Sequence, residues 1–138
     1  MPEITANFTN VVGTEAALGW AGAHTIVADR PAGVAGGEGL GFNGGQLLAL
    51  ALGGCFCNDL RYAAEQMGRA LGDINVAVKL KLEGDPLLVT RAQLSVRLTA
   101  ADGADPGEIF EIAKTNSTVG NSVRRGFPVD IESEKADD

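Results

Sequence analysis

The chain has 138 residues, is 45% hydrophobic, and carries 18 acidic against 11 basic residues, a formal net charge of −7. This hydrophobic content excludes global disorder, and the length fits a single domain, 1–138, near the size at which a dimer interface often supplements the core. The negative charge argues against a nucleic-acid partner, which requires clustered basic residues, because only Lys79/Lys81 and Arg124/Arg125 form even small basic spots.

The amino-terminal third predicts a meander of three short strands and then a loop. The strands are expected at Ile4–Val12, Ala16–Trp20 and Ala23–Ala28, with Gly13-Thr14 and Gly22 between them. The first residues lack the basic start and continuous apolar run of a signal peptide, so we expect a cytoplasmic protein.

The glycine-rich stretch Arg30–Gly45 predicts a loop that leads into a helix. Arg30 and Glu38 are interpreted as surface charges of this loop. Asn43 with Gln46 three residues later resembles a capping box, so a long helix should begin near Gly44.

Apolar residues of this helix recur at a four-residue step, at Leu48, Leu52, Phe56 and Leu60. The natural stop is Gly72. The uncharged run Gln46–Asn58 is too short to span a membrane, which needs about 20 apolar residues. The first half of the helix is apolar nearly all round, and one small sheet can cover only one side of it. We therefore expect a second copy of the chain to cover the other side of the helix.

Both cysteines, Cys55 and Cys57, lie within this helix. At positions i and i+2 they point about 200° apart, so they cannot form a disulfide without unwinding the helix. Because His24 is the single histidine, we expect no zinc site, and no cofactor is indicated. Cys55 is either a small buried hydrophobic residue or a reactive thiol, and the pattern alone leaves both readings open.

The second half of the chain predicts a strand pair, two short helices and a last strand. Alternating residues indicate antiparallel strands over Ile74–Glu83 and Leu88–Leu98, joined by a turn at Gly84-Asp85-Pro86. Asp105 followed by Pro106 predicts the start of the second helix.

Ser117 or Thr118 can cap a further short helix that runs through Val123 and closes at Gly126. The segment Phe127–Glu132 is expected to form the last strand. This order of elements predicts an α+β fold.

The phrase GGEGLGFNGGQLLALALGGCF, together with the closing GNSVRRGFPVDI, resembles the OsmC/Ohr family of osmotically inducible and organic hydroperoxide resistance proteins. The resemblance runs from about Thr25 to Glu132. It implies an α+β, OsmC-like fold with antiparallel sheets and a long central helix at the core of an intertwined homodimer. It also implies a reactive cysteine on that helix, and Cys55 matches it by its position in the motif.

In this family, the cysteine thiolate attacks an organic hydroperoxide and becomes a sulfenic acid, which a second cysteine resolves as a disulfide. Here Ser117 stands at the resolving position, so the family disulfide cannot form. The family glutamate is replaced by Gly44-Gly45, which leaves Glu38 as the nearby carboxylate.

The family arginine comes from the amino-terminal strands, but this chain has no Lys or Arg before Arg30. Arg124 and Arg125 are the candidate replacement cations, because the helix that they end lies near the cysteine pocket in the family. The usual cation that stabilises a thiolate is therefore missing from its usual place.

Two functions follow from the resemblance. In the first, Cys55 reduces organic hydroperoxides in oxidative-stress defence, and an external thiol is the reductant. In the second, the protein is a degenerate, non-catalytic homodimer that binds a small apolar ligand or has a structural role.

Overall fold

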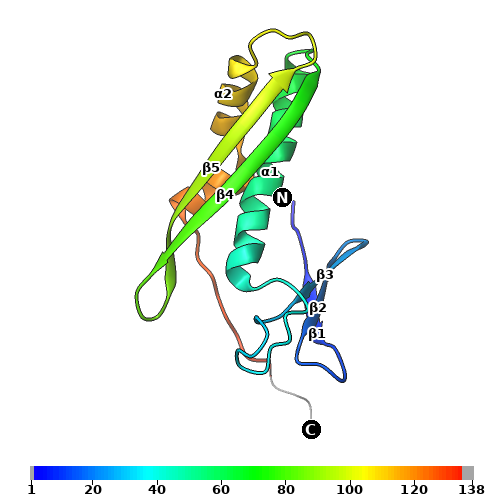
Figure 1. Cartoon of the computed structure of the whole chain (residues 1–138), viewed down its shortest axis with the longest axis vertical. Helices are drawn as coiled ribbons and strands as arrows, with labels where there is room; N and C mark the ends of the chain where they lie inside the picture. Colours follow the sequence, from blue (N-terminus) through cyan, green and yellow to red (C-terminus); the bar gives the residue numbers. More distant parts are fainter. Residues whose placement is uncertain (1, 135–138) are drawn as a thin grey trace. The chain divides into compact units, whose positions relative to one another are not determined.

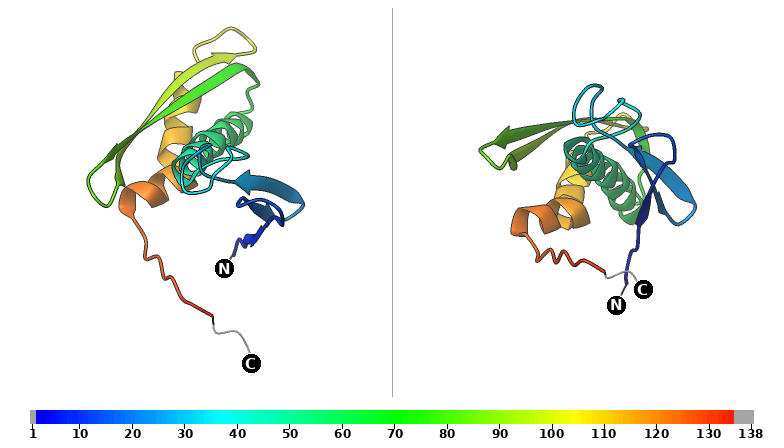
Figure 2. Two further views of the ribbon diagram at one scale, coloured as in Figure 1. Left: turned by 60° about the horizontal axis from the view of Figure 1, so that its bottom comes forward. Right: turned by 90° about the horizontal axis from the view of Figure 1, so that it is seen from below.

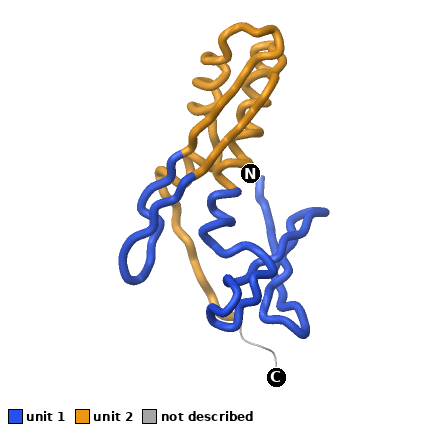
Figure 3. The backbone as a smooth tube through the Cα atoms, in the orientation of Figure 1, with its two compact units in different colours: residues 1–50, 79–93 blue, residues 51–78, 94–138 orange. Residues whose placement is uncertain are grey.

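A computed structural model describes residues 2–134 of the chain. The chain divides into two compact units, of which unit 1 comprises the residues up to Leu50 together with Lys79–Gln93 (Figure 3). Unit 2 comprises Ala51–Val78 and the residues from Leu94 onward. The elements follow one another as three strands, a long helix, two long strands and two short helices (Figure 1). The predicted α+β class is therefore confirmed.

Unit 1 contains the predicted meander as a three-stranded antiparallel sheet. Its strands occupy β1 (Asn7–Asn10), β2 (Ala17–Ala21) and β3 (His24–Ala28). The strands β1 and β3 are shorter than expected, and β2 has the expected length but begins one residue later. They pair in sequence order with β2 in the centre, as tight turns between consecutive antiparallel strands dictate.

The loop between β3 and the long helix is organised by the buried carboxylate of Asp29. Its Oδ2 atom accepts hydrogen bonds from the backbone N–H groups of Leu40 (3.0 Å) and Glu38 (3.2 Å), and its Oδ1 atom accepts one from Arg30 (2.8 Å). These bonds, led by the one from Leu40, hold the pKa of Asp29 below its ordinary value because they stabilise the charged form.

Arg30 differs from the expected simple surface charge, whereas Glu38 is exposed as expected. The Arg30 side chain is half-buried, and its guanidinium donates to the carbonyl oxygen of Glu15 at 2.6 Å. The same group forms an ion pair with Asp29 at 3.2 Å. Arg30 therefore ties this loop to the turn between β1 and β2.

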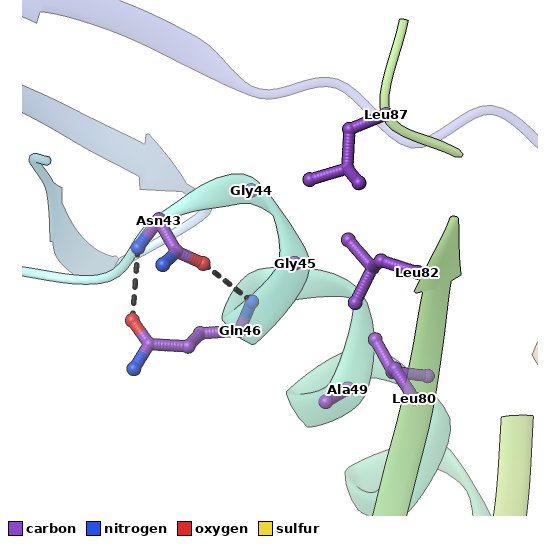
Figure 4. A pocket seen from close by; sticks show the side chains of 8 residues that line it. All are labelled: Asn43, Gly44, Gly45, Gln46, Ala49, Leu80, Leu82 and Leu87. Carbon is purple, nitrogen blue, oxygen red and sulfur yellow. Dashed lines mark hydrogen bonds between the residues drawn. The ribbon is translucent and has the colours of Figure 1, made fainter. Parts of the chain in front are cut away.

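The long helix α1 (Gly44–Gln66) begins at the predicted residue. The Gln46 N–H donates to Asn43 Oδ1 at 2.9 Å, and the Asn43 N–H donates to Gln46 Oε1 at 3.0 Å (Figure 4). This reciprocal pair is the predicted capping box, which satisfies two backbone donors at the helix start.

The expected end of α1 at Gly72 is wrong. The helix ends at Gln66, and Gly68 takes a left-handed conformation with φ of 65°. The Arg69 N–H bonds to the Ala64 carbonyl, and the Gly68 N–H bonds to that of Glu65, which is the Schellman pattern. Gly72 lies instead in the following strand.

Unit 2 holds a hydrophobic core between α1, α2 (Gly107–Asn116) and the hairpin of β4 (Leu71–Glu83) and β5 (Leu88–Ala100). Both helices lie on the same side of the hairpin (Figure 2). Leu60 and Ile109 are fully buried, and the Phe56 and Phe110 rings pack with centroids 5.8 Å apart. The alternating residues of the strands face this core, namely Ile74, Val76, Leu94, Val96 and Leu98. The predicted strand pair and its apolar face are confirmed.

The helix α2 begins one residue later than the predicted cap implies, because Asp105 Oδ1 accepts from the Gly107 N–H while Pro106 takes the cap position. The next helix, α3 (Thr118–Arg125), is capped by Ser117 and closed at Gly126, close to the predicted bounds.

The prediction that Phe127–Glu132 forms the last strand is wrong for the single chain. These residues form no strand, and their apolar members are exposed: Phe127 by 62%, Val129 by 71% and Ile131 by 92%. A strand exists only when its backbone groups pair with a neighbour, and no described segment pairs with this one.

In residues 2–134, no helix is both long enough and apolar enough to cross a membrane.

Candidate functional site

The Cys55 thiol lies in unit 2, about three turns into α1, and its partner is a carboxylate on the same helix. The Sγ atom donates a hydrogen bond to Oδ2 of Asp59 over 3.6 Å. The four-residue spacing places the two side chains one above the other on one helical face. Cys55 is half-buried and is not part of a disulfide.

Asp59 is a costly residue at this position. It is only 8% exposed, and within the described part of the chain no ion pair involves it. A buried carboxylate without a counter-charge costs free energy that an apolar side chain would not. No ion pair in the described residues accounts for this carboxylate, and the side-chain partner that it has is the Cys55 thiol.

A small pocket of about 130 Å³ opens beside Asp59 within unit 2. Its polar lining includes Asp59, Tyr62 and Asn116, and its apolar lining includes Ile112 and Ala113. Cys55 is not itself a lining residue, so the Asp59 carboxylate, which lines the pocket and accepts the Cys55 hydrogen bond, is the link between the pocket and the thiol.

Ser117, at the expected resolving position, is buried and has a structural role. Its Oγ atom accepts a hydrogen bond from the Gly120 N–H at 3.4 Å, which makes it the N-cap of α3. Its neighbours Asn116 and Thr118 line the small pocket beside Asp59.

The two candidate cations end α3 and are exposed. The Arg124 guanidinium donates to Oδ1 of Asn121, and no hydrogen bond or ion pair within residues 2–134 joins Arg124 or Arg125 to Cys55. Glu38 belongs to unit 1, where its backbone takes part in the Asp29 network. Among the predicted site residues that the structure describes, Cys55 is the one whose side chain contacts an ionisable group suited to acid-base chemistry. That group is Asp59, which was not predicted from the sequence.

Sequence reasoning missed Asp59, although a signal for it was present. A carboxylate four residues after a cysteine in an otherwise apolar helix lies on the same face as the thiol.

The second cysteine, Cys57, is likewise half-buried and free, and no hydrogen bond of its side chain occurs among the described residues. Within that part of the chain, no three His, Cys, Asp or Glu side chains gather as a metal site would require.

A second and larger pocket of about 480 Å³ lies in unit 1 at the start of α1 (Figure 4). The first turn of the helix, including Gly44 and Gly45, forms one wall. Leu80, Leu82 and Leu87 form the other wall. This size and this apolar lining are typical of pockets that bind small molecules.

Comparison with known proteins identifies the family. The model of the OsmC family, described as OsmC-like protein, matches residues 36–132. The match covers more than half of the chain, so this protein belongs to the OsmC-like family. No curated protein matches the chain.

Solved structures show the same fold at low sequence identity. An osmotic stress induced and detoxification response protein from Psychrobacter arcticus is 21% identical, with a TM-score of 0.70 over 88% of this chain and 89% of that one. An OsmC-like protein of unknown function from Vibrio cholerae is 14% identical, with a TM-score of 0.74 over 88% and 94%. An organic hydroperoxide resistance protein from Legionella pneumophila is 19% identical, with a TM-score of 0.63 over 90% of each chain.

Proposed function

We propose that this protein reduces organic hydroperoxides with a single reactive cysteine, Cys55, in an oxidative-stress response. The observation that carries the proposal is the free, half-buried thiol hydrogen-bonded to a buried carboxylate that lines a small pocket. Family membership supports a peroxide-related role, and the structural neighbours include proteins named as organic hydroperoxide resistance proteins.

The proposed cycle has two stages. The Cys55 sulfur attacks the terminal oxygen of the hydroperoxide, the O–O bond breaks, and the products are a sulfenic acid and an alcohol. An external thiol then attacks the sulfenic acid, releasing water and forming a mixed disulfide, and a second thiol restores Cys55. Because Ser117 is the N-cap of α3 and carries no sulfur, no disulfide within one chain replaces the external thiol.

The test is to treat the protein with an organic hydroperoxide and trap sulfenic acid with a dimedone-type reagent, read by intact mass. We expect one adduct on the wild-type chain, none on Cys55→Ser, and one on the matched control Cys57→Ser. An unmodified wild-type chain at millimolar hydroperoxide would exclude peroxidase activity. An adduct that disappears in Cys57→Ser but persists in Cys55→Ser would show that the wrong thiol has been assigned.

The larger pocket favours a second candidate function, the binding of a small apolar ligand by a non-catalytic protein. Three leucines line the wall that faces the first turn of α1. A fluorescent apolar probe should bind the wild-type protein and lose affinity in Leu82→Asp, since a charge would enter the apolar wall. Equal binding by both proteins would place the probe elsewhere and remove the support for this function.

We further infer that the working form is a homodimer. The structure leaves large apolar side chains uncovered on α1, including Leu50 (52% exposed) and Tyr62 (71%), and the apolar residues of the segment after α3 are exposed too. A second copy that covered these residues would remove them from water. Light scattering at micromolar concentration should give about twice the chain mass of 14.2 kDa, whereas a monomer would contradict the inference.

A further inference from the structure

Peroxide reduction by a thiol has to move one proton, and the structure offers one group in contact with the sulfur that is able to move it. The sulfur has to lose its proton before or during its attack, and the departing alkoxide has to gain one. Asp59 accepts the hydrogen bond of the Cys55 thiol at 3.6 Å and also lines the small pocket beside the pair. Its second oxygen, Oδ1, has no hydrogen-bond partner among residues 2–134.

On the basis of the function proposed above, we propose that Asp59 is a catalytic residue that transfers this proton. The Asp59 carboxylate takes the thiol proton while the Cys55 sulfur forms a bond to the terminal oxygen of the hydroperoxide. The O–O bond breaks, and Asp59 returns the proton to the departing alkoxide, which leaves as an alcohol. Sulfur is oxidised to the sulfenic acid by two electrons, the peroxide is reduced by two, and Asp59 ends as it began.

The surroundings of Asp59 fit this role better than a structural one. The residue is 8% exposed, so most of its surface is removed from bulk water. Its carboxylate has no counter-charge in the described part of the chain, so stability does not explain a charged group there. The alkyl group of a small hydroperoxide would lie against the apolar side of the pocket, at Ile112 and Ala113.

Asp59→Asn tests the proposal, because it keeps the shape of the side chain and removes its ability to take a proton. Two rates at Cys55 are measured for each protein, oxidation by tert-butyl hydroperoxide and alkylation by iodoacetamide. Alkylation also needs a thiolate, but its leaving iodide needs no proton. We expect oxidation to slow at least about 10-fold, as loss of an acid-base group does, and by a larger factor than alkylation, because alkylation does not need a proton returned to its leaving group.

The matched control is Glu65→Gln, an exposed carboxylate on the same helix, for which both rates should equal those of the wild type. Parallel slowing of oxidation and alkylation in Asp59→Asn would overturn the proposal, because it would show a general disturbance of the thiol. Unchanged oxidation in Asp59→Asn would also overturn it and would leave the peroxidase function standing. A wild-type chain that is not oxidised at all would overturn the peroxidase function and, with it, the role of Asp59.

A second measurement needs no variant and applies even if Asp59→Asn fails to fold. In heavy water, the wild-type oxidation rate should fall by a larger factor than the alkylation rate, because only oxidation passes the proton on to a leaving group. Equal solvent isotope effects on the two reactions would overturn the proposal.

Discussion

Leu60→Ala removes the most deeply buried side chain of α1, one residue after Asp59. Leu60 is 0% exposed and packs in a core that includes Ile109 of α2. The change removes about three carbon groups at about 0.8 kcal/mol each, or about 2.4 kcal/mol. The cavity left behind adds to this, so the free energy of unfolding should fall by about 3 to 4 kcal/mol.

Urea denaturation at one fixed protein concentration measures this loss, since dimer formation would make stability depend on concentration. With a slope of about 1 to 3 kcal/mol per molar, the midpoint should fall by about 1 to 4 M. Leu50→Ala is the matched change on the same helix, and at 52% exposure it should cost only about 1 kcal/mol. A loss below about 1 kcal/mol for Leu60→Ala would refute the packing of α1 described above. A loss for Leu50→Ala as large as that for Leu60→Ala would indicate that a second chain buries Leu50.

Substitutions at three places in the chain test local structure. Asn43→Ala and Gln46→Ala should each destabilise the protein, Asn43→Ala by about 1 kcal/mol, and a double mutant whose cost equals the sum of the two would contradict their reciprocal bonding. The pKa of Asp29 is lowered, first by the hydrogen bond from the Leu40 N–H. The charged Asp29 therefore stabilises the fold fully at pH values above its unfolded-state pKa near 4. This stabilisation is lost as the pH falls through the lower folded-state pKa. Asp29→Asn should therefore flatten the acid dependence of the unfolding midpoint, and an unchanged acid profile would argue against the loop network. Gly68→Ala should cost about 1 kcal/mol in thermal unfolding, because φ is 65° although no atom lies within 4 Å of the added methyl group; a neutral result would mean that the helix end can be remodelled.

The sequence by itself determined the elements whose signals are local. Asn43 and Gln46 form the predicted capping box because both bonds join residues three apart and need no tertiary partner. The alternation of β4 and β5 predicted their buried face, since a period of two fixes which side chains share a face. The same local chemistry predicted Ser117 or Thr118 as the cap of α3, and the structure has Ser117 there.

The candidate site was predictable only in part. Cys55 was identified from the resemblance, and its spacing to Asp59 was readable in the sequence as a shared helical face. The small pocket beside the pair was not readable, because Asn116 and Thr118 come from segments more than 50 residues away in the sequence. Only the packing of α2 against α1 brings them there.

Tertiary structure also decided between competing local signals. Gly68 and Gly72 are both natural helix stops in the sequence, but Gly72 is taken up by β4, where the next residue, Asp73, donates its N–H to Thr99 Oγ1 at 2.8 Å. The segment Phe127–Glu132 alternates as a strand does, yet it forms none in this chain. A helix satisfies its backbone within its own segment, but a strand depends on a neighbour that its own sequence does not contain.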